Sequence, residues 1–113
     1  MTQLEFIEQI IKEKEAVILD ANDKIWSYAE LPYEETRSSA LLCSILESEG
    51  FTVETGVAEI PTAFVARYVV GTGKPVMGIL GEFDALATLS QKAGCTVKDP
   101  VQNGGSGHGC GHC

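Results

Sequence analysis

The chain has 113 residues, of which 44% are hydrophobic and 21% charged, a composition typical of one soluble globular domain rather than a disordered, collagenous or disulfide-rich protein. Its formal net charge of −8 argues against nucleic acid or an anionic membrane as a partner, because both would be repelled at long range. We see neither an apolar run of about 18 residues nor a secretory signal, so we expect a cytoplasmic protein with reduced cysteines.

The first half of the chain is predicted to be helical. Thr2 and Glu5 have the spacing of a capping box, and apolar residues then recur every three, four or seven positions. This pattern predicts an amphipathic helix over about 3–30. A second helix is expected over about 34–49, with Gly50 at its C-terminal cap.

Three strands are predicted after the helices, over about 51–57, 63–70 and 75–81. The third is apolar on both faces, as expected of a central strand that is covered on both sides. A Gly-rich loop at 82–113 follows. The order α-α-β-β-β therefore predicts an α/β fold, and the absence of closing elements suggests that 1–113 is a single partial domain.

The second half of the chain is where chemistry is expected. Residues 1–59 carry a net charge of −9, which we interpret as the solvated faces of helices, whereas residues 60–113 carry +1. The second segment also holds 10 of the 12 glycines and both histidines. Its Gly-rich end is an unusual composition for a simple linker.

The residues from Cys110 to Cys113 spell Cys-Gly-His-Cys, the active-site tetrapeptide of protein disulfide isomerases. A redox role is disfavoured, because such a motif needs a strand before it and a helix after it to lower the pKa of its first cysteine. A structural zinc site made of Cys95, Cys110, His112 and Cys113 remains an alternative, although Cys95 has no second ligand close to it in the sequence.

A catalytic metal site accounts for more of the residues of this region than the redox motif or the structural zinc site does. Cys110 and His112 supply thiolate and imidazole, which are good donors for zinc, from a Gly-flanked loop. Asp84 lies just beyond the predicted central strand, where the functional groups of α/β sheets gather, and a carboxylate there can bind a metal or orient a ligand.

Two stretches of this region resemble the paired signature of the aminoacylase and hippurate-hydrolase branch of the metallo-amidohydrolases. They are Gly-Glu-Phe-Asp-Ala-Leu at 81–86 and Gly-His-Gly-Cys-Gly-His at 107–112. Between them, Ala-Thr-Leu-Ser-Gln-Lys-Ala-Gly-Cys at 87–95 is similar to the p-aminobenzoyl-glutamate hydrolase group within that branch. The resemblance covers essentially the whole chain and implies the N-terminal part of a zinc-peptidase-like (phosphorylase/hydrolase-like) domain.

The resemblance implies hydrolysis of an amide bond that joins an acyl or aminobenzoyl group to an amino acid, as in aminobenzoyl-glutamate-like substrates, with a divalent ion, Zn or Mn, as cofactor. Cys110 and His112 fall on metal-ligand positions of the family, and Asp84 falls on the acidic catalytic position that supports the metal centre. Glu82 sits where other branches place a histidine ligand, and His108 matches the first histidine of the motif. We expect Glu82 and His108 to support the ligands rather than to bind the metal.

Cys113 departs from the family pattern, which has Asn or Asp at this position. The family's paired glutamates, one of them the general base, its later histidine ligands and its dimerising lid domain lie beyond the motif. The resemblance therefore implies that 1–113 is a fragment of a homo-oligomeric enzyme, inactive on its own and able to lack the metal. Alternatives are a non-catalytic α/β module that self-associates through uncovered apolar faces, or a small structural zinc-binding domain.

Overall fold

The computed structural model describes residues 1–113 and consists of two helices followed by a small antiparallel sheet. In chain order its elements are α1 (Gln3–Tyr28), α2 (Thr36–Ser48), β1 (Thr52–Thr55), a 3-10 turn η1 (Val57–Glu59) and β2 (Phe64–Arg67). This architecture confirms the predicted α/β class, although the sheet has two strands. That 1–113 forms a single partial domain stays a prediction. None of the helices has the length and apolar character needed to cross a membrane.

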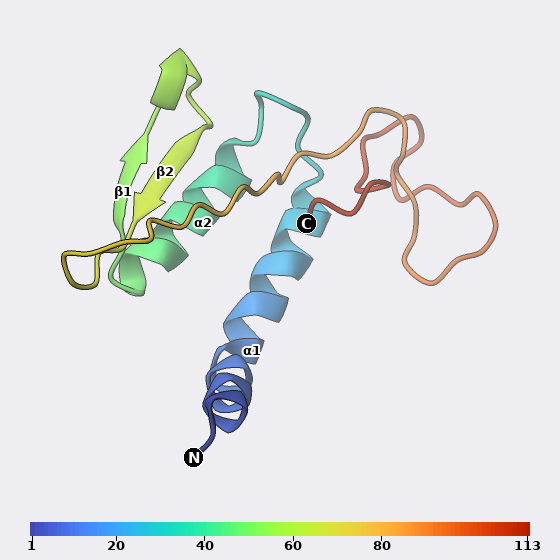
Figure 1. Ribbon diagram of the computed structural model, residues 1–113. Coiled ribbons are helices and arrows are strands. Elements are labelled where there is room, and N and C mark those ends of the chain that lie inside the picture. The colour runs from blue at the N-terminus through green and yellow to red at the C-terminus, as the bar shows by residue number, and fades with distance from the viewer.

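The elements form two groups in space: α2 with the hairpin, and the end of α1 with the C-terminal loop (Figure 1). Helix α2 packs against the hairpin of β1 and β2, whereas α1 is long and contacts mainly α2. The loop at 82–113, orange to red in Figure 1, gathers beside the C-terminal end of α1. The predicted Gly-rich motif is thus placed against the end of a helix rather than at the edge of the sheet.

Helix α1 begins with the predicted capping box. The hydroxyl of Thr2 accepts a hydrogen bond from the Glu5 amide at 3.1 Å, and the Glu5 carboxylate accepts one from the Thr2 amide at 2.7 Å. The helix ends at Tyr28, because Ala29 adopts a left-handed conformation with φ 45°. Only Ala21 and Ile25 of α1 are buried, so the apolar residues of its N-terminal half remain exposed.

Helix α2 begins two residues later than the sequence predicts, at Thr36. Its own N-cap residue makes no side-chain cap; instead, the carboxylate of Glu30 accepts hydrogen bonds from the amides of Arg37 at 3.0 Å and Ser38 at 2.7 Å. At the other end, Gly50 takes a positive φ of 93°, which is the conformation expected of a glycine after a helix. The connection before α2 therefore supplies the cap that α2 lacks.

The hairpin follows α2 directly. β1 and β2 pair antiparallel in a register that sets Thr52 opposite Arg67 and Thr55 opposite Phe64. The two strands have four residues each and so are shorter than predicted. A salt bridge of 3.0 Å between Arg67 and Glu54 joins the strands on their exposed face.

The predicted third strand at 75–81 is not formed, which corrects the sequence-based expectation. This segment is extended but unpaired, and Ile79 and Leu80 are 100% and 96% exposed. The reason is physical: a central strand needs a neighbour on each side for its backbone hydrogen bonds and apolar cover on both faces. Neither β1 nor β2 pairs with it, so the apolar sequence has nothing to pack against.

The loop at 82–113 lacks helices and regular strands, as predicted, yet it is held by specific contacts. Leu86 and Gly107 exchange two backbone hydrogen bonds of 2.9 and 3.0 Å, which draw the two motif stretches together. Gly107 is required there, because a Cβ atom at this position would overlap the carbonyl oxygen of Leu89. The loop therefore folds back on itself at the motif.

Candidate metal-ligand site

The structure brings three of the five predicted site residues into direct contact. The Nδ1 atom of His112 lies 2.8 Å from an oxygen of Asp84, and its Nε2 atom lies 3.1 Å from an oxygen of Glu82. The side chains of His112 and Asp84 are 22% and 20% exposed, whereas that of Glu82 is mostly exposed. Residues 28 positions apart in the sequence thus meet at one imidazole ring.

The electrostatics of this contact favour the charged imidazole. The hydrogen bond with Asp84 raises the pKa of His112 above its ordinary value of 6.5; partial removal from water opposes this, and the negative charge of Glu82 adds to it. A protonated His112 can donate from both ring nitrogens at once, one to each carboxylate. The carboxylate of Asp84 also fixes which ring nitrogen points outward.

Cys110 does not join this contact. Its thiol is exposed, and no group of three or more His, Cys, Asp or Glu side chains is placed to share one metal ion. The four residues of the alternative structural zinc site are likewise not gathered around one point. Cys113 instead lines an apolar groove beside Val17 and Leu42, residues of α1 and α2.

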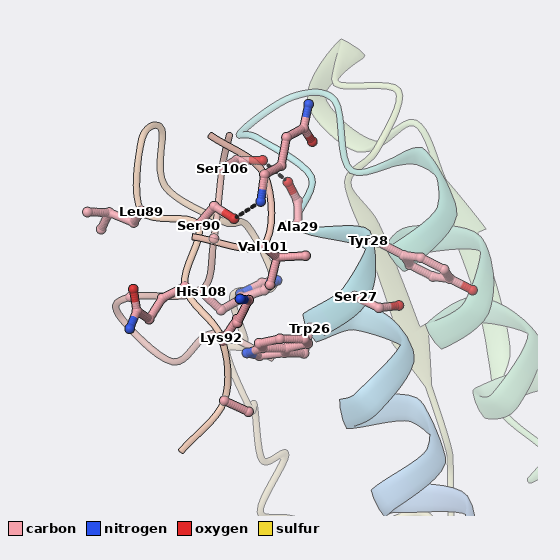
Figure 2. A pocket seen from close by; sticks show the side chains of 15 residues that line it. Trp26, Ser27, Tyr28, Ala29, Leu89, Ser90, Lys92, Val101, Ser106 and His108 are labelled. Atoms are coloured by element: carbon pink, nitrogen blue, oxygen red, sulfur yellow. Dashed lines mark hydrogen bonds between the residues drawn. The ribbon is translucent and has the colours of Figure 1, made fainter. Parts of the chain in front are cut away.

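His108 turns toward α1. Its Nε2 atom lies 2.9 Å from the carbonyl oxygen of Ile25, and its Nδ1 atom is buried without a hydrogen-bond partner. Together with Trp26, Lys92 and Ser106, it lines a cavity of about 340 Å³ between the end of α1 and the loop (Figure 2). His108 is thus placed to position the motif rather than to bind a metal, although its role stays a prediction.

A divalent metal is compatible with the donors that the structure places together. Because Asp84 holds Nδ1 of His112, Nε2 is the nitrogen left for a metal, and the Glu82 carboxylate faces that atom. Imidazole and carboxylate suit zinc and manganese, and a carboxylate on the far ring nitrogen is the usual support of a metal-bound histidine. The structure therefore places one candidate ligand, His112, with Asp84 as its support and Glu82 beside it, and Cys110 lies two residues away in the sequence.

Two contacts at this site escaped the sequence-based prediction. The Ser106 hydroxyl donates to the carbonyl oxygen of Ala29, and the Ala85 amide donates to that of Glu30 at 2.7 Å. Backbone carbonyls at a helix end carry no sequence signal of their own. The only hint in the sequence was the position of Ser106 and Ala85 within the two motif stretches.

No protein-family model and no solved structure matches the chain. Among curated proteins, it is 49% identical over 107 residues to a subunit of the p-aminobenzoyl-glutamate hydrolase of Escherichia coli, which covers 95% of this chain and 22% of that protein. It is 30% identical over 112 residues to thermostable carboxypeptidases 1 and 2 of Saccharolobus solfataricus, covering 99% of this chain and 28% of each. The predicted resemblance to the p-aminobenzoyl-glutamate hydrolase group is therefore confirmed, and the chain spans about a quarter of the length of these relatives.

Proposed function

We propose that residues 1–113 carry part of the metal site of a metal-dependent amidohydrolase that cleaves the amide bond between an acyl or aminobenzoyl group and an amino acid. The observation that carries this proposal is the contact of His112 with Asp84 and Glu82. These three residues come from the two stretches of the predicted signature, and the similar proteins are named as a hydrolase and as carboxypeptidases.

Each residue has a distinct task in this proposal. His112 would hold the ion through Nε2, with Cys110 as thiolate donor and Glu82 beside the same nitrogen; Asp84 accepts a hydrogen bond from Nδ1 and keeps the ring in one orientation. A bound Zn or Mn ion supplies polarisation of the amide carbonyl and a lower pKa for its water. Glu30, Glu34 and Glu35 belong to the helical half, and no other acid of 1–113 is a convincing general base, so we propose that 1–113 alone is inactive.

The substrate, location and assembly belong to the same proposal. The name of the bacterial relative favours an aminobenzoyl-glutamate-like substrate and a role within an enzyme of several subunits. We propose that the complete enzyme acts on such an N-acyl amino acid in the cytoplasm as a homo-oligomer.

The metal proposal is tested by titrating purified 1–113 with Zn²⁺ and with Mn²⁺ in a calorimeter. We expect binding by the wild-type chain and at least about tenfold weaker binding by His112→Ala and Cys110→Ser, on the order of the loss that accompanies removal of a metal ligand or its support. Cys95→Ser is the matched control and keeps wild-type affinity. A loss with Cys95→Ser as well would favour the structural zinc site instead, and no binding by the wild type would refute the proposal.

The proposed inactivity of 1–113 has its own test. Incubation of the purified, metal-supplemented chain with p-aminobenzoyl-glutamate should release no p-aminobenzoate above the rate measured for His112→Ala. Turnover that depends on His112 would show that these residues form a complete active site.

A second candidate function is a self-associating, non-catalytic module. The exposed apolar segment at 76–80 favours it, because unpaired backbone with exposed apolar side chains is a site for pairing between chains. This candidate requires no metal, so the calorimetric titration separates it from the first.

A further inference from the structure

The C-terminal end of α1 and the residues just beyond it offer carbonyl oxygens that can accept hydrogen bonds from the motif. The carbonyl oxygens of Ala29 and Glu30 lie beyond the helix, whereas that of Ile25 already accepts the Ala29 amide at 3.2 Å and keeps its second lone pair for another donor. Three carbonyl oxygens here receive donors from the two motif stretches. The pairs are His108 Nε2 with Ile25, the Ser106 hydroxyl with Ala29, and the Ala85 amide with Glu30.

These hydrogen bonds bracket the candidate site on both sides. Ala85 directly follows Asp84 and is fully buried, so its bond to Glu30 fixes the backbone next to the carboxylate. Ser106 and His108 precede Cys110 and His112, and Figure 2 shows both lying against the end of α1. The two stretches, far apart in the sequence, are therefore each tied to the same helix end.

The contact made by His108 depends on one particular atom. Nε2 must carry a proton in order to donate to Ile25, whereas Nδ1 is buried without a hydrogen-bond partner. A buried nitrogen without a partner costs free energy, so apolar packing alone would favour a phenylalanine here. The gain that offsets this cost is the hydrogen bond at Nε2.

We infer that Ser106 and His108 are positioning residues, which hold the motif against the carbonyl oxygens of the α1 end so that His112 meets Asp84. The inference rests on the proposed function for its effect on metal binding. Its structural content, the dependence of the His112–Asp84 contact on bonds to α1, stands without a metal.

The test pairs a disruptive with a conservative variant at each position. His108→Phe removes the donor to Ile25, whereas the side-chain amide of His108→Gln can place a nitrogen where Nε2 lies. Ser106→Ala removes the hydroxyl, and Ser106→Thr keeps it. Ser90→Ala is the matched control, because the Ser90 hydroxyl accepts a hydrogen bond from Gln102 within the loop and none from α1.

Two readouts are measured for each variant of the full chain. Nitrogen-15 NMR of the metal-free chain, recorded above the pKa of His112 so that the ring carries a single proton, reports whether that proton stays on Nδ1, and calorimetry gives the affinity for Zn²⁺. We expect His108→Phe and Ser106→Ala to lose the single Nδ1-protonated form and to bind Zn²⁺ at least about tenfold more weakly, as removal of a ligand's support does. His108→Gln, Ser106→Thr and Ser90→Ala should keep both the Nδ1-protonated form and the wild-type affinity for Zn²⁺.

The inference is overturned if His108→Phe leaves the His112 tautomer unchanged, or if His108→Gln is as damaging as His108→Phe. A wild-type chain that binds no Zn²⁺ would count against the proposed function alone, because the NMR readout needs no metal. Far-UV circular dichroism shows whether each variant keeps its helices, and Ser106→Ala, the smallest change, decides the outcome if His108→Phe fails to fold.

Discussion

His112 is the residue on which the candidate site depends, because it contacts a carboxylate through each ring nitrogen. A ring held on both sides keeps one orientation, and its proton on Nδ1 is fixed by Asp84. Protons and metal ions compete for Nε2. Metal affinity should therefore rise with pH as His112 loses its second proton.

Replacing Asp84 by asparagine tests the cause of the raised pKa. Asp84→Asn removes the charge, so the pKa of His112 should fall toward 6.5, as followed by an NMR titration of its ring signals. Because the folded-state pKa is raised, the stabilisation is fully present below the unfolded-state pKa and is lost as pH rises through the folded-state value. The variant should lose this pH dependence of stability. Glu82→Gln is the control, and its effect should be smaller because Glu82 makes the weaker contribution.

At the residue scale, the signature predicted which side chains matter but not all of their contacts. The pairing of His112 with Asp84 follows a known pattern of carboxylate support for a histidine, whereas the approach of Glu82 to Nε2 depends on how the loop folds. The bonds of Ser106 and His108 to α1 were not predictable, because their acceptors are backbone atoms.

At the scale of elements, Glu30 connects the parts of the fold. Its carboxylate caps α2 through the amides of Arg37 and Ser38, and its carbonyl oxygen holds Ala85 beside the site. Burial raises the pKa of Glu30, but the hydrogen bonds from Arg37 and Ser38 outweigh it and leave the pKa below 4.5. One residue thus couples the position of α2 to that of the motif loop.

We expect Glu30→Ala to lower the free energy of unfolding by about 1–2 kcal/mol, the typical cost of a lost helix cap and an unpartnered amide. Urea denaturation, monitored by circular dichroism, measures this free energy, and Glu34→Ala at an exposed position is the control. Because the pKa of Glu30 is lowered in the folded state, its contribution is present above the unfolded-state pKa and lost as pH falls through the folded-state value. A difference between variant and wild type that persists in acid would contradict this assignment.

The helices were predictable from local sequence, because a capping box, an apolar period and a terminal glycine act within a few residues. The third strand was not, since a strand forms only where partners from elsewhere in the chain or from another chain complete its hydrogen bonds. Without such partners the apolar segment at 76–80 stays unpaired and exposed.

At the scale of the whole molecule, uncovered apolar surface is the dominant feature. The segment at 76–80 and the N-terminal half of α1 are both exposed, and large exposed apolar patches mark sites of association. Homo-oligomerisation, predicted from the resemblance, would cover part of this surface. It stays a proposal that can be measured directly.

We expect purified 1–113 to self-associate as its concentration rises, as measured by analytical ultracentrifugation. Ile79→Lys should lower the association constant at least several-fold. The fully exposed Ile79 lies in an unpaired apolar segment, where the charge of a lysine would oppose strand pairing between chains. Val97→Lys, an exposed apolar position in the loop, controls for the added charge and should leave association unchanged. A chain that stays monomeric, or two variants that behave alike, would show that the segment at 76–80 does not drive association.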